Sequence, residues 1–105
     1  MGNGMDPVHI KHSAGKAHVS LAPSLGVADV RAMHEMLGSL LTGKSLISLD
    51  GGQVEHLDTA AMQVLTSFYR TASDRGLVLT WKKISPGLQR AARLLGLEST
   101  LGMTS

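Results

Sequence analysis

The segment VEHLDTAAMQVLTSFYRTA, residues 54–72, carries the clearest structural pattern in the chain. Five of its apolar residues recur at i, i+3, i+4, i+7 and i+11, which is the spacing of one face of an α-helix. These residues are Ala61, Val64, Leu65, Phe68 and Ala72. Asp58 precedes them as a helix N-cap, and Gly76 follows them as a stop signal. The segment therefore predicts an amphipathic helix that begins after Asp58 and buries one face.

Strands are predicted on both sides of this helix. Residues 45–49 (SLISL) form a short apolar run that ends at a DGG turn sequence. Residues 77–81 (LVLTW) form a near-continuous apolar run, which is typical of a strand buried on both faces. Ser85 and Pro86 then supply the N-cap and first position of a further helix, which Gly96 ends. Its predicted inner face consists of Leu88, Ala91, Ala92 and Leu95.

The N-terminal half adds a hairpin and one more helix. Two extended runs, residues 8–11 and 16–21, flank a short SAG turn, which predicts an antiparallel hairpin. Residues 23–26 contain Pro and Gly and are expected to break the second strand. Apolar residues then recur at threes and fours, which predicts a helix over residues 27–41, ended by Gly43.

These elements follow the order strand, strand, helix, strand, helix, strand, helix. Strand–helix–strand crossovers favour parallel neighbours, so we expect an α/β protein with a mixed sheet of about four strands and helices packed on it. A chain of 105 residues has the size of one domain, and we expect residues 1–105 to form one. Residues 1–6 are predicted to be a disordered N-terminus, and either Met1 or Met5 can be the native start.

Composition excludes several classes of function. The net charge is only +2 and there are only three aromatic residues, which argues against a nucleic-acid partner. The chain has no cysteine, which excludes a disulfide scaffold, a thiol nucleophile and a thiolate metal site. No apolar run reaches the ~20 residues of a membrane helix, and no targeting signal is present. We expect a cytoplasmic protein without membrane insertion, either a monomer or a weak dimer.

One segment matches the phosphate-binding loop literally, since residues 38–45 read GSLLTGKS. That loop needs a strand before it and a helix after it, because the helix N-terminus supplies the backbone N–H groups that hold the phosphates. Here the order is reversed, because Gly38 lies in a predicted helix and Ser45 opens a predicted strand. We interpret the match as accidental.

Other candidate sites are weak. His9 and His12 lie three apart in an extended run, so they point to opposite faces and do not form a metal site. Lys82 and Lys83, with two arginines of the last predicted helix, are interpreted as solvated surface. No serine stands in a nucleophile elbow and no acid–base pair is evident. We therefore expect no catalytic residue, no metal and no cofactor.

The informative position is Thr59, the first residue of the predicted helix. Its hydroxyl stands at the helix N-terminus, where unpaired N–H groups carry partial positive charge. A phosphate there would gain about 0.3–1 kcal/mol from the helix dipole and add ~1.5–2 negative charges beside Asp58 and Glu55. These effects roughly offset for the fold, so modification would change partner binding and not stability. The simpler interpretation is that Asp-Thr is ordinary helix-start chemistry.

Four stretches together resemble the STAS domain, the module of bacterial anti-sigma-factor antagonists and of sulfate-transporter tails. They are the strand LISLD (46–50), the loop and helix with the D-T pair (54–65), the RG turn (75–76), and the last helix with SPGL and LLGL (85–97). Their order and spacing match the family over nearly the whole chain, up to Leu101. The resemblance implies a small α/β sandwich that binds proteins and catalyses nothing.

In the antagonist branch, the Ser or Thr after Asp is phosphorylated by a partner kinase that doubles as the anti-sigma factor. The resemblance therefore implies that Thr59 is phosphorylated and that such a kinase docks on the adjacent loop and helix start. The implied partner-binding residues are Asp50, Glu55, His56, Asp58, Thr59, Ala60 and Met62. The family often has Gly where this chain has Ala61, and the extra methyl group would obstruct a kinase packing closely there.

Two other branches fit the D-T-A-A sequence at least as well. One is the accessory subunit of phospholipid-transport ABC systems, which binds the ATPase subunit. The other comprises small STAS proteins associated with chemotaxis or other signalling kinases. The expected partner is therefore a protein, either a kinase or anti-sigma factor or an ABC transporter ATPase, and the sequence leaves these alternatives open.

Overall fold

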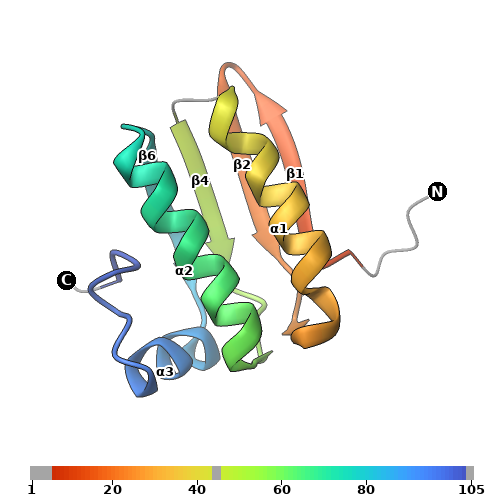
Figure 1. The fold of residues 1–105 in the computed structure, drawn as a ribbon, viewed down its shortest axis with the longest axis vertical. Helices are drawn as coiled ribbons and strands as arrows, with labels where there is room; N and C mark the ends of the chain where they lie inside the picture. Colours follow the sequence, from red (N-terminus) through yellow and green to blue (C-terminus); the bar gives the residue numbers. More distant parts are fainter. Residues whose placement is uncertain (1–5, 44–45, 104–105) are drawn as a thin grey trace.

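The computed structural model describes residues 6–43 and 46–103 (Figure 1). The predicted disorder of residues 1–6 therefore falls outside the described residues, except for Asp6, as does the choice between Met1 and Met5. Lys44 and Ser45, which end the phosphate-loop match, also lie outside them.

Four strands form the main sheet, in the spatial order β1-β2-β4-β6. β1 (Val8–Ser13) and β2 (Lys16–Leu21) pair antiparallel as the predicted hairpin. β4 (Leu46–Gly51) runs parallel to β2 on one side and to β6 (Val78–Ile84) on the other. The sheet is therefore mixed, which confirms the predicted α/β class.

Two helices cover one broad face of this sheet, and no helix covers the other within the described residues (Figure 1). They are α1 (Val30–Gly38) and α2 (Thr59–Asp74). α1 is flanked by two short 3-10 segments, η1 (Val27–Asp29) and η2 (Ser39–Thr42), so the predicted first helix is three consecutive helical segments. α3 (Pro86–Leu94) follows β6 and packs beside the segment that leads into α2.

The core lies between the helices and the inner face of the sheet. Alternate residues of β2 and β4 are buried, as expected for strands with one covered face. The largest fully buried side chains include Val19, Ile47, Leu49, Met33, Leu37 and Leu65. The sheet, α1 and α2 thus contribute to one apolar cluster. Burial of this cluster is the main stabilising contribution to the fold.

The strand at residues 77–81 differs from the prediction. Its apolar run predicts burial on both faces, but β6 is an edge strand and its residues are exposed or half-buried. Leu79 and Trp81 pack against the core, whereas Val78 points outward and is 54% exposed. A register shift between Leu49 and Asp50 of the neighbouring strand accommodates an extra residue in β6.

A second, two-stranded sheet was not predicted. β3 (Ser24–Leu25) pairs in parallel with β5 (His56–Leu57). Pro23 does end β2, as the sequence indicates, but the chain then forms a new pair with the segment just before α2. This small sheet holds the predicted partner-binding loop against the start of η1.

Candidate functional site

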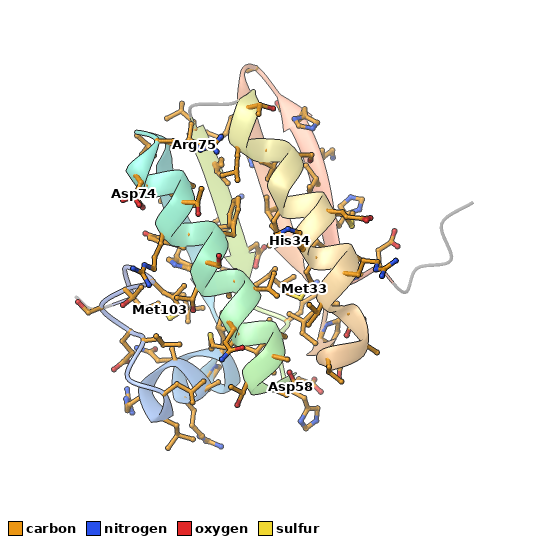
Figure 2. The ribbon with its side chains drawn as sticks, in the orientation of Figure 1. Met33, His34, Asp58, Asp74, Arg75 and Met103 are labelled. Atoms are coloured by element: carbon orange, nitrogen blue, oxygen red, sulfur yellow. The ribbon has the colours of Figure 1, made fainter. Side chains whose placement is uncertain are left out.

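Asp58 joins the starts of two helical segments. Its Oδ1 accepts a hydrogen bond from the Ala61 N–H (3.0 Å), which confirms the predicted N-cap of α2. Its Oδ2 accepts from the Val27 N–H (2.9 Å) at the start of η1. Gly26 leaves room for this carboxylate, since a Cβ there would lie 3.0 Å from Oδ2. Figure 2 shows Asp58 at the end of α2 where these elements meet.

The loop before α2 is held from both sides by backbone contacts. On one side, the Pro23 carbonyl accepts hydrogen bonds from the Glu55 N–H (2.7 Å) and the His56 N–H (3.1 Å). On the other side, the Ser85 hydroxyl, which also caps α3, donates to the Val54 carbonyl (2.6 Å). The loop therefore presents its side chains from a fixed backbone.

Five of the seven predicted partner-binding residues lie together at this loop and helix start. Glu55, His56, Asp58 and Thr59 are exposed, and Ala60 is half-buried. Thr59 is the first residue of α2, and its hydroxyl makes no hydrogen bond within residues 6–43 and 46–103. The threonine is thus accessible at a helix N-terminus, next to the capping carboxylate.

The other two predicted residues do not belong to this surface. Met62 is fully buried in the core, so it is not accessible to a partner, and that prediction is wrong. It lies one turn after Asp58, on the inner side of α2. Asp50 lines a hollow with Lys82 on the face of the main sheet that α2 does not cover. The alternation of β4, in which Leu49 is buried, places Asp50 on that opposite face.

Ala61 is also fully buried. Its methyl group faces the core and does not reach the surface of α2. The expectation that this methyl group obstructs a kinase is therefore wrong, and the departure from Gly at this position leaves the accessible surface unchanged.

A groove of about 500 Å³ separates this loop from α3. Its loop side includes Glu55, His56 and Asp58, and its helix side includes Arg90 and Leu94. Leu94 is 78% exposed, and Val27, beside Asp58, is 72% exposed. The sequence pattern did not identify these apolar residues as part of the site.

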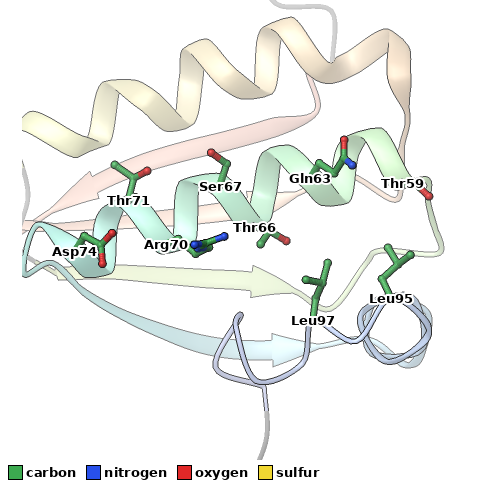
Figure 3. A pocket seen from close by; sticks show the side chains of 9 residues that line it. All are labelled: Thr59, Gln63, Thr66, Ser67, Arg70, Thr71, Asp74, Leu95 and Leu97. Carbon is green, nitrogen blue, oxygen red and sulfur yellow. The ribbon is translucent and has the colours of Figure 1, made fainter.

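A second groove, of about 550 Å³, runs along α2 (Figure 3). Thr59 lies at one end of it and Asp74 at the other, and Leu95 and Leu97 form the opposite wall. Leu95 was expected on the inner face of the last helix, but it is 43% exposed and lines this groove. No sequence signal marked it, because the helical spacing that places Leu95 with Leu88 and Ala92 is the same whether or not the helix end is covered. The start of α2 therefore lies between two grooves, each with an exposed leucine.

The weaker candidate sites do not gain support. Gly38 ends α1 and the next strand begins at Leu46, so the element order is the reverse of a phosphate-binding loop. Within residues 6–43 and 46–103, no group of three or more His, Asp or Glu side chains is arranged to hold a metal ion. In the same part of the chain, no helix has the length and apolar character needed to span a bilayer.

Comparison with known proteins identifies the family. A family model described as "Mlab, STAS domain" matches residues 8–103, so the chain belongs to the STAS-domain family. No curated protein sequence matches the chain.

Three solved structures share the fold at low sequence identity. An anti-sigma factor antagonist from Mycobacterium paratuberculosis has 19% identity and a TM-score of 0.70, with 89% of this chain and 80% of that chain covered. The phosphorylated form of the Bacillus cell fate determinant SpoIIAA has 10% identity and a TM-score of 0.70, with 88% and 86% covered. The crystal structure of Mglu has 15% identity and a TM-score of 0.67, and the match covers 81% of this chain but only 22% of Mglu.

Proposed function

We propose that this chain is a non-enzymatic protein-binding module that docks a kinase or anti-sigma-type regulator on the surface around the start of α2. We further propose that phosphorylation of Thr59 switches this binding. The observation that carries the proposal is the exposed Thr59 at the first position of a helix whose start Asp58 fixes. STAS domains of the antagonist type are generally non-enzymatic, which agrees with this role.

The shape of the surface supports docking of a protein. Three of the five large apolar side chains that are exposed in the described residues, Val27, Leu94 and Leu95, border this end of the molecule. They stand beside charged and polar side chains, which is the usual composition of a transient interface. The backbone of the loop is already held in place, so a partner loses little entropy in ordering it.

The electrostatics support a switch at Thr59. A phosphate on its hydroxyl would stand at the N-terminus of α2. The N–H groups of the first turn would stabilise the phosphate there. The same phosphate would stand beside Asp58 and Glu55 and add ~1.5–2 negative charges to that surface. A partner that had accepted the unmodified surface would then meet repulsion and a charge to desolvate.

The test uses the cognate kinase with ATP and reads the intact mass of the chain. We expect one added phosphate on the wild-type chain and none on Thr59→Ala, while the control Ser67→Ala, also exposed on α2, is modified like the wild type. An unmodified Thr59 under these conditions would contradict the switch. Docking is tested separately, because Leu94→Arg should abolish binding of the kinase to the unmodified chain, whereas Thr59→Ala should retain it.

A second candidate function is an accessory subunit of a phospholipid-transport ABC complex. Ala60 favours it, because this small half-buried residue lets a permanent partner approach the first turn of α2 closely. This role predicts that Thr59→Ala leaves copurification of the partner unchanged, whereas Ala60→Trp abolishes it. Affinity purification from the native cell separates the two functions by the partner recovered, an ATPase with a permease or a kinase of the histidine-kinase type.

A further inference from the structure

The face of the main sheet that no helix covers carries an excess of positive charge. By strand alternation, the charged residues that point to it are Lys11 in β1, Lys16 in β2, Asp50 in β4 and Lys82 in β6. Lys83 joins them, because the register shift in β6 pairs it with Asp50. Four lysines against one aspartate give this face a net charge of +3, whereas the net charge of the whole chain is +2. The surplus charge of the molecule is therefore concentrated on one side.

This face is broad and contains a hollow. The molecule measures 36 × 34 × 20 Å, and Figure 1, viewed down the shortest axis, shows the sheet spread across the two longer dimensions. A hollow of about 350 Å³ lies on the outer surface of the sheet, where Lys11, Ser48 and Lys82 are among the lining residues. Two lysines, several hydroxyl groups and the Asp50 carboxylate thus surround a depression in an extended surface.

The kind of cation on this face narrows the chemistry of its ligand. All five arginines of the chain belong to α1, α2 with its C-cap, or α3, and none lies on this face. Arginine is the residue that binds individual carboxylates or phosphates with two parallel hydrogen bonds, whereas lysine acts as a point charge. Lysines spread over a broad face are suited to a diffuse layer of negative charge.

The aromatic and aliphatic side chains of this face limit the class of ligand further. Trp81 packs toward the core and donates its indole N–H to the Leu101 carbonyl (2.8 Å), so it offers this face no ring for stacking nucleic-acid bases. Leu46 and Val78 are register neighbours that point outward and are 44% and 54% exposed. Lys16 is paired with Leu46 on its other side, so a lysine and two aliphatic side chains form one row. Such a row suits the boundary between lipid headgroups and acyl chains.

We propose that the helix-free face of the main sheet is a peripheral docking face for the surface of an anionic lipid bilayer. Binding there uses lysine charge and the Leu46–Val78 pair without insertion of any helix. Asp50 lies on the same face and opposes the attraction. The proposal is independent of docking at Thr59, because α2 lies on the opposite side of the sheet (Figure 1).

The test is cosedimentation of the whole chain with vesicles of phosphatidylglycerol and phosphatidylcholine in equal parts, at low ionic strength. We expect binding to these vesicles, none to pure phosphatidylcholine, and a loss of binding as salt rises, because ions screen the attraction. Each basic charge at an anionic surface changes the partition coefficient about 5-fold, so Lys82→Glu or Lys11→Glu should lower it about 25-fold. Asp50→Asn should raise it about 5-fold, because it removes one opposing charge.

The matched control is Arg31→Glu on α1, which changes the net charge by the same amount on the other side of the molecule. It should leave the partition coefficient within about 2-fold of the wild type, since α1 faces away from the bilayer. An equal loss for Arg31→Glu and Lys82→Glu would overturn the proposal, because net charge alone would then explain binding. No binding of the wild type to the anionic vesicles would also overturn it.

A further experiment distinguishes an anionic lipid surface from an acidic protein as the ligand of this face. If a polyglutamate peptide binds this face and the vesicles do not, the ligand is an acidic protein segment and not a bilayer. That result would overturn the proposal. Lys11, Lys16 and Lys82 are exposed strand residues, and Asp50→Asn keeps an oxygen that can accept the Gly52 N–H, so circular dichroism should show unchanged folding. Lys16→Glu replaces either variant that fails to fold, with the same expected loss.

Discussion

At the scale of single residues, the Asp58 carboxylate has two partners of very different origin. Its bond to the Ala61 N–H lies within one helical turn, and the residue preferences of helix N-caps predict it from sequence. Its bond to the Val27 N–H joins residues 31 positions apart, and no local pattern indicates it. The sequence therefore predicts that Asp58 begins α2 but not that it also holds the start of η1.

Replacing Asp58 tests this double role. Asp58→Ala removes both accepted hydrogen bonds, and we expect the free energy of unfolding to fall by about 2–3 kcal/mol, more than loss of a cap alone. Asp58→Asn retains one oxygen acceptor, so its loss should be about half as large. Urea unfolding of the three chains measures the difference. Equal losses for the two variants would contradict the use of both oxygens.

In the candidate site, too, the features set by neighbouring residues could be predicted from sequence, and those set by distant residues could not. The exposed positions of Asp58 and Thr59 follow from the predicted helix start, since the residue before the helix and the first residue in it lie at the surface. Met62 was misplaced because the inner side of α2 begins within its first turn. The grooves beside Thr59 could not be predicted, because Leu94 and Leu97 reach them through the packing of elements remote from α2 in the sequence.

At the scale of elements, the close approach of α3 to the loop before α2 depends on one glycine. A Cβ at Gly87 would lie 3.0 Å from the Glu55 carbonyl oxygen and 3.1 Å from that of Val54. These are backbone atoms, which cannot rotate away as the end of a side chain does. Ser85 fixes the same contact through its hydroxyl bond to Val54, so the start of α3 and the loop form one packed unit.

Gly87→Ala should therefore destabilise the chain by about 1–3 kcal/mol through overpacking. The matched control is Gly38→Ala at the end of α1, where an added Cβ meets nothing within 4 Å and the backbone is helical. That change should stabilise by up to about 1 kcal/mol, because alanine is the better helix residue. Thermal melts of both variants check the opposite signs, and a stabilised Gly87→Ala would contradict the close contact.

The strands show which part of the fold local patterns can predict. β1 and β2 were predicted because their pairing is local, with one short turn between them. β6 was predicted as a strand but placed wrongly, since its apolar residues look alike whether they face helices or solvent. The position of β6 at the edge is set by the sheet order, which depends on contacts across the chain. The β3–β5 pair joins two short segments far apart in sequence, and no hydrophobic period marks it.

At the scale of the whole molecule, the C-terminal segment completes the core. Leu101 is fully buried, and its carbonyl accepts the Trp81 indole N–H. Leu101→Ala should cost about 2–5 kcal/mol of unfolding free energy, the usual cost of truncating a buried leucine. Leu94→Ala, at an exposed position, should change stability by less than about 0.5 kcal/mol. Denaturant unfolding compares them, and similar effects would contradict the assignment of Leu101 to the core.

The edge position of β6 has a consequence for how the molecule behaves among its own copies. A strand with a neighbour on one side only is a template on which another chain can add a strand, and this is a common beginning of aggregation. β6 carries two consecutive lysines, Lys82 and Lys83, next to the register shift that bends the ladder. The lysines and the register shift discourage such pairing at the C-terminal end of β6. The other end, which begins at the exposed Val78, lacks both, so it is the part of β6 most prone to self-association. At high protein concentration, self-association should therefore begin at the Val78 end of β6.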